Sequence, residues 1–64
     1  MTIKSARQAA NLTQRQLADG TGINIRQLQK IESGEIKLEN LTARNYLALA
    51  LALGADPYKL IDLA

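Results

Sequence analysis

The amino-acid sequence predicts an all-α fold, a compact bundle of five short helices that form a single domain over residues 1–64. Apolar residues recur at helical spacing in several short stretches. Each stretch is bounded by residue types that start or stop helices, such as Thr, Asn, Asp-Pro and Gly. The chain has only 64 residues and no cysteine, so its stability must come from efficient helix packing or from a partner subunit.

The first helix is expected over residues 2–11. Ile3, Ala6 and Ala10 fall on one helical face of this stretch. Asn11 is a typical stop residue, so we expect the helix to end there.

The second helix is expected to begin after Thr13, because Thr13 and Gln16 have the spacing of a capping box. Leu17 is expected to face inward. Gly20 and Gly22 are expected to end this helix, and Gly22 can adopt the left-handed backbone that a sharp turn requires.

The third helix is expected from the cap residue Asn24 to about Ser33, with Gly34 as its stop. Leu28 and Ile31 lie on its apolar side. The opposite side consists of hydrogen-bonding side chains, namely Arg26, Gln29, Lys30 and Ser33.

A loop is expected over residues 35–41, followed by a helix over residues 43–53 that Thr42 caps. Leucine and alanine alternate from residue 47 to residue 53, a period that is typical of a strand. Both residue types favour a helix, however, and Gly54 is a helix stop, so we predict a helix. It then has one apolar face with Leu47 and Leu51 and another with Tyr46, Leu49 and Leu53. Such a helix is either central or shared with a second subunit.

The last helix is expected to start at Asp56-Pro57, because proline is favoured at the first helical position. It is expected to end near Asp62. Leu60 and Ile61 are expected to face inward.

The composition argues against several classes of protein. The chain has no His and no Cys, and its carboxylates are scattered, so we expect no metal, no cofactor and no enzymatic activity. No apolar stretch is long enough to span a membrane, and Lys4 and Arg7 interrupt residues 1–10, which therefore do not form a signal peptide. A cytoplasmic protein without membrane contact is expected. The net charge of +2 is only weakly basic, although residues 1–44 hold seven Lys or Arg against four Asp or Glu.

A set of spaced residues carries a resemblance to a known family: Thr13, Gln14, Leu17, Ala18, Gly22, Ile23, Leu28, Ile31, Glu32 and Gly34. With these residues the chain resembles the XRE-type helix-turn-helix family, the DNA-binding domains of phage repressors and Cro proteins. The stretches 49–54 and 56–57 resemble the closing helices of that family. The resemblance covers residues 3–61 and implies a lambda-repressor-like fold with the helix-turn-helix in the second and third helices.

Thr21 departs from the family pattern, because the family usually has a larger aliphatic residue there. This difference predicts poorer packing at the end of the second helix. Gly20 adds to the effect, since a helical glycine costs about 1 kcal/mol relative to alanine. The end of the second helix is therefore expected to fray.

The resemblance also implies roles for individual residues. The third helix would contact bases in the major groove of DNA through Ile25, Arg26, Gln29 and Lys30. Contacts with backbone phosphates would come from Gln14, Gln27, Ser33, the Gly34 N–H, Lys37, Asn40, Thr42 and Arg44. Two alternatives stay open: Ile25 either completes the core or packs on a thymine methyl group, and Lys30 either reads guanine or holds a phosphate.

Arg7 and Glu32 match a pair that forms a partly buried salt bridge in the family. Glu32 falls on the inward side of the third helix, where an unpaired charge would be costly. This position supports pairing and makes Glu32 a structural residue.

Two functions compete. The first is sequence-specific binding of double-stranded DNA by a transcription regulator, most simply a repressor, that forms a homodimer mainly on DNA. The second is an interaction module or an antitoxin that uses the same fold to bind a toxin or another protein. The second apolar face of the helix over residues 43–53 motivates it, because Tyr46, Leu49 and Leu53 exceed what a small core needs.

Overall fold

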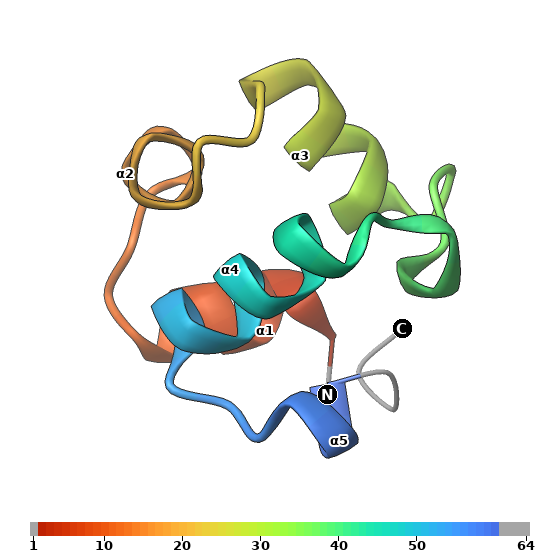
Figure 1. The fold of residues 1–64 in the computed structure, drawn as a ribbon. Helices are drawn as coiled ribbons and strands as arrows, with labels where there is room; N and C mark the ends of the chain where they lie inside the picture. Colours follow the sequence, from red (N-terminus) through yellow and green to blue (C-terminus); the bar gives the residue numbers. More distant parts are fainter. Residues whose placement is uncertain (1, 61–64) are drawn as a thin grey trace.

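A computed structural model describes residues 2–60 and shows helices and no strand within that range (Figure 1). The all-α prediction is therefore confirmed. The elements are α1 (Ile3–Ala9), α2 (Gln14–Thr21), α3 (Ile25–Ser33), a 3-10 helix η1 (Leu38–Asn40), α4 (Ala43–Leu53) and α5 (Pro57–Leu60).

The helices pack around one small core. α2 packs against α3 and α4, α1 packs against α3, and α5 packs against α4 (Figure 1). The buried apolar residues come from all of these elements, from η1 and from the turn before α3: Ile3, Leu17, Ala18, Ile23, Leu28, Ile31, Leu38, Leu49, Ala50 and Leu60. None of the helices within residues 2–60 is both long and apolar enough to cross a membrane.

Side-chain caps begin the helices where the sequence predicts. Thr13 and Gln16 form the expected capping box at α2. Asn24 accepts a hydrogen bond from the Arg26 N–H at α3, and Thr42 accepts one from the Asn45 N–H at α4. These bonds satisfy N–H groups that have no partner inside a helix, which explains why local sequence fixes the starts.

α1 is shorter than predicted. It spans Ile3–Ala9, while Ala10 caps its end and Asn11 adopts a left-handed backbone conformation with φ 60°. Asn11 therefore lies in the turn after the helix and is not its last residue. Asparagine tolerates this conformation better than most residues.

The end of α2 differs from the prediction, because Gly20 is an interior helical residue and does not end the helix. The helix continues to Thr21, whose hydroxyl donates to the Leu17 carbonyl at 2.8 Å and accepts the Ile23 N–H at 3.2 Å. Gly22, with φ 74°, makes the turn. Thr21 therefore makes hydrogen bonds on both sides of the turn.

α4 has the predicted bounds. The face with Tyr46, Leu49 and Leu53, which we expected to be available to a partner, instead faces the core. Leu49 is fully buried, and Tyr46 and Leu53 pack against the core. Leu47 and Leu51 are the outward pair, with exposed fractions of 53% and 85%. The core accommodates the wider face because α2 and α5 cover it.

The predicted loop over residues 35–41 contains η1, whose Leu38 is buried in the core. At α5, the Asp56 side chain accepts the Tyr58 N–H, and the Tyr46 hydroxyl donates to the Pro57 carbonyl. Leu60 is buried as predicted. The predicted position of Ile61 and the predicted end near Asp62 lie outside the described residues.

Candidate nucleic-acid interface

The outward face of α3 is polar and open to solvent. Arg26, Gln29 and Lys30 are exposed on it. With Ser33 and Glu35 they line a shallow depression on the surface. A helix with this composition can offer donors and acceptors to a polar groove.

The inward face of α3 holds the helix on the core. Leu28 is fully buried and Ile31 is 5% exposed. Leu17 from α2 and Ile23 from the turn are buried in the same cluster. Close packing of these large buried residues holds α3 in one position, so the positions of its outward side chains are also defined.

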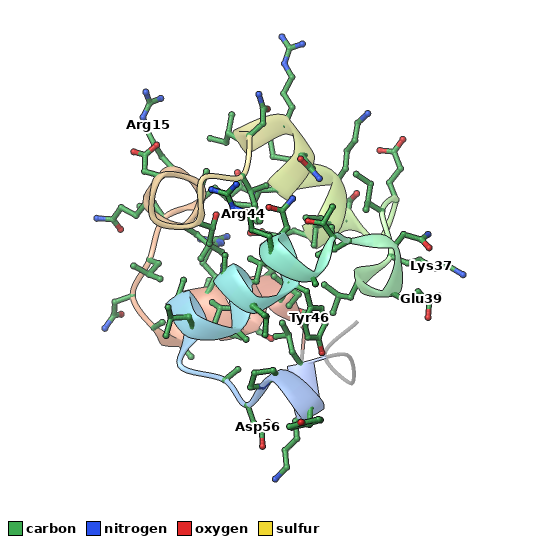
Figure 2. All side chains as sticks on the ribbon, viewed as in Figure 1. Arg15, Lys37, Glu39, Arg44, Tyr46 and Asp56 are labelled. Atoms are coloured by element: carbon green, nitrogen blue, oxygen red, sulfur yellow. The ribbon has the colours of Figure 1, made fainter. Side chains whose placement is uncertain are left out.

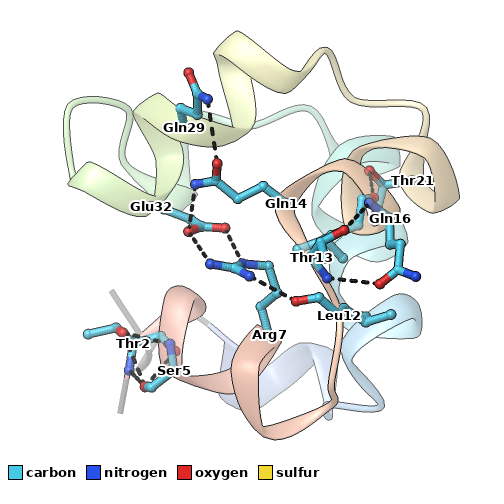
Figure 3. A network of polar contacts seen from close by, with 11 residues as sticks. Thr2, Ser5, Arg7, Leu12, Thr13, Gln14, Gln16, Thr21, Gln29 and Glu32 are labelled. Atoms are coloured by element: carbon cyan, nitrogen blue, oxygen red, sulfur yellow. Dashed lines mark hydrogen bonds and ion pairs between the residues drawn. The ribbon is translucent and has the colours of Figure 1, made fainter.

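An ion pair joins α1 to α3 at the edge of the core (Figure 3). Arg7 Nε donates to Glu32 Oε2 at 2.9 Å, and Arg7 Nη2 donates to Glu32 Oε1 at 3.3 Å. Arg7 Nη1 also donates to the Leu12 carbonyl at 2.8 Å. The two side chains are only 10% and 4% exposed, so the pair is nearly removed from water. The structure thus contains the salt bridge that the family resemblance implies.

Gln14 extends this ion pair toward the outward face of α3. Its Nε2 donates to Glu32 Oε1 at 3.2 Å, and its Oε1 accepts from Gln29 Nε2 at 3.4 Å (Figure 3). The sequence reasoning missed these contacts. Gln29 and Glu32 are three residues apart on one helix, so both lie on the side of α3 that faces Gln14. This spacing is the feature of the sequence that could have predicted the contacts.

The other predicted base-contacting residue, Ile25, has an exposed fraction of 36% and is not part of the buried core. The structure therefore favours the surface alternative for this side chain. Gln27, a predicted phosphate contact, is half-buried.

The end of α3 is less suited to a phosphate than the resemblance implies. The Gly34 N–H donates to the Ile31 carbonyl at 3.2 Å, so it is not free to bind a phosphate as predicted. Gly34 has φ 86° and closes the helix, where the partial charge of the helix end is negative. The Ser33 hydroxyl donates to the Lys30 carbonyl at 3.0 Å, although the side chain remains exposed.

The remaining predicted phosphate contacts lie around η1 and the start of α4. Lys37, Asn40, Thr42 and Arg44 are all exposed. Thr42 also caps α4. In Figure 2, Lys37 and Glu39 project outward from the η1 region, so this segment presents both signs of charge.

The described surface offers hydrogen-bonding groups and positive charge. Among residues 2–60, no three His, Cys, Asp or Glu side chains gather closely enough to hold a metal ion. Within the same range, no buried side-chain polar atom lacks a hydrogen-bond partner.

Comparison with curated proteins and with solved structures finds no significant match. A family model, described as a helix-turn-helix domain, matches residues 2–64. The match includes both helices and the turn that form the candidate interface. Helix-turn-helix domains bind DNA with the second helix of the motif, which is α3 in this chain. The chain belongs to this helix-turn-helix family, and the family supports DNA as its partner.

Proposed function

We propose that this protein is a sequence-specific transcription regulator, most simply a repressor, of the XRE type. The observation that carries the proposal is the exposed polar face of α3, with Arg26, Gln29 and Lys30, on a helix that buries Leu28 and Ile31 on its opposite face. Such a helix can enter the major groove while its own packing stays intact.

In the proposed complex, Arg26, Gln29, Lys30 and Ile25 meet base edges. Arginine can bind guanine O6 and N7 with two hydrogen bonds, and an apolar side chain can pack on a thymine methyl group. The proposed phosphate contacts come from exposed or half-buried residues around this helix: Gln14, Gln27, Ser33, Lys37, Asn40, Thr42 and Arg44. They would position the domain without reading sequence.

The test is selection of bound duplexes from a random pool, followed by titration of variants. Arg26→Ala is expected to relax base preference at one position and to cost about 1–3 kcal/mol there. Lys37→Ala is expected to weaken binding to all sequences equally. A wild-type protein that enriches no sequence at low salt would remove the proposal.

A second candidate function is protein–protein interaction, and the exposed pair Leu47 and Leu51 favours it. We propose a second copy of the chain as the partner, because two leucines one turn apart can meet the same pair across a two-fold axis. The patch is small, so the homodimer would be weak alone and would form mainly on DNA. A toxin is the competing partner.

Sedimentation of the wild type and of Leu51→Glu, each with and without duplex DNA, tests this second candidate. A homodimer on DNA that Leu51→Glu disrupts supports it. A wild type that remains monomeric on a duplex with two half-sites contradicts it.

A further inference from the structure

We propose that Glu32 sets, through Gln14, the orientation of the Gln29 amide, and that Gln29 thereby favours adenine over guanine. The proposal rests on the DNA-binding function proposed above. Three consecutive contacts carry it, from Arg7 to Glu32, from Glu32 to Gln14 and from Gln14 to Gln29 (Figure 3).

The first step is the chemistry of Glu32. Both of its carboxylate oxygens accept hydrogen bonds from the Arg7 guanidinium, at 2.9 and 3.3 Å. A carboxylate can only accept, so the side chain of Gln14 must present its NH2 group to Glu32. The Gln14 carbonyl oxygen therefore faces away from Glu32.

The second step transfers this orientation to α3. Gln14 Oε1 can only accept, so Gln29 must present its own NH2 group to it. Gln29 is exposed, and its carbonyl oxygen points away from the network in Figure 3. A glutamine without this contact could turn either end of its amide outward, whereas Gln29 is held with its acceptor outward.

The third step is the match with a base edge. The outward groups of Gln29 are one acceptor and one remaining N–H. In the major groove adenine offers a donor at N6 and an acceptor at N7, which matches this pair. Guanine offers two acceptors, O6 and N7, and one of them would face the carbonyl oxygen of Gln29. The held amide therefore discriminates against guanine.

The experiment measures relative affinity for duplexes that differ at one base pair. The duplexes come from selection with the wild type, and the position that loses its preference in Gln29→Ala is assigned to Gln29. We expect the wild type to favour adenine over guanine there by about thirtyfold, the middle of the range for a bidentate contact.

Two changes at Gln14 test the transfer of orientation. In Gln14→Lys the ammonium can still donate to Glu32 but offers no acceptor to Gln29, so Gln29 can turn its NH2 group outward. The preference is then expected to reverse toward guanine. In Gln14→Ala the Gln29 amide is free, and the preference for adenine is expected to fall to roughly twofold, since a freely turning amide keeps only part of the bidentate discrimination.

Gln8→Lys is the matched control, because Gln8 is exposed on α1, lies outside the network and gains the same charge. Its ratio of adenine to guanine affinity is expected to equal that of the wild type. Thermal unfolding of each variant shows whether it is folded, and Gln14→Ala decides the question if Gln14→Lys does not fold.

Some outcomes overturn this inference alone: guanine is preferred at the Gln29 position, no position changes in Gln29→Ala, or the ratio is the same in the Gln14 variants as in the wild type. Each of these requires a wild type that selects a sequence. A wild type that selects none overturns the sequence-specific function proposed above and this inference with it.

Discussion

α3 and α4 each bury one face in the same core, but the faces that they expose to solvent differ in chemistry. The outward face of α3 carries Arg26, Gln29 and Lys30, whereas that of α4 carries Leu47 and Leu51. Polar side chains can exchange their hydrogen bonds with water for hydrogen bonds with a DNA groove. Exposed leucines offer no hydrogen bond to a groove, but they gain free energy against another apolar surface.

The difference matches the two functions proposed above. α3 has the chemistry to read a nucleic acid, and α4 has the chemistry to contact a protein. The inner faces also differ, because α3 includes the charged Glu32 beside its leucine and isoleucine, while the buried residues of α4 are Leu49 and Ala50.

The largest expected effect comes from the leucines of α4. Leu49→Ala should lower the free energy of unfolding by about 2–5 kcal/mol, because it leaves a cavity at a fully buried position. Leu51→Ala, two residues away, should change it by less than about 0.5 kcal/mol. Denaturant titration measures both. Equal losses would contradict the helical assignment of faces, since a strand would place the two leucines on one side.

Glu32→Ala should have the next largest effect on the α3 side. It removes the partner of a nearly buried Arg7 and also the acceptor of Gln14, so we expect a loss of about 2–4 kcal/mol in unfolding free energy. Glu39→Ala is the control, because Glu39 is exposed and should cost less than about 0.5 kcal/mol. An unchanged melting temperature in Glu32→Ala would show that the ion pair does not hold α1 to α3.

Sequence predicts well those features that depend on neighbouring residues. The caps at Thr13, Asn24 and Thr42 and the left-handed Gly22 follow from local hydrogen bonding and backbone freedom, and the structure contains all four. The inward positions of Leu17 and Leu28 follow from helical periodicity. These features set where α2, α3 and α4 begin.

Features that depend on residues distant in the sequence cannot be predicted from local sequence patterns. The leucine–alanine alternation gives α4 two comparable faces, and only the packing of α2 and α5 selects the one with Leu49. The contact of Gln14 with Gln29 likewise requires the angle between α2 and α3. Nor does periodicity show that Leu38, in a mainly polar loop, is buried.

A smaller expected effect concerns the polar face of α3 and the salt dependence of DNA binding. Lys30→Ala should reduce the slope of log affinity against log salt by about one unit if Lys30 contacts a phosphate. Lys59→Ala is the matched control, because Lys59 is exposed on α5, away from α3, and should leave the slope unchanged. Equal slopes for Lys30→Ala and the wild type would show that Lys30 does not contact a phosphate.

The smallest expected effect lies at the end of α2, the helix that packs against both α3 and α4. A Cβ added at Gly20 meets no atom within 4 Å, and the residue is helical. Gly20→Ala should therefore raise the free energy of unfolding by about 0.5–1 kcal/mol. A Cβ added at Gly22 also meets no atom within 4 Å, but an alanine at its φ of 74° is strained. Gly22→Ala should therefore lower the free energy of unfolding by about 1–2 kcal/mol. Thermal unfolding should shift in opposite directions for the two variants. A destabilised Gly20→Ala would mean that α2 ends before Gly20, and that Thr21 does not hold the turn on which the placement of α3 depends.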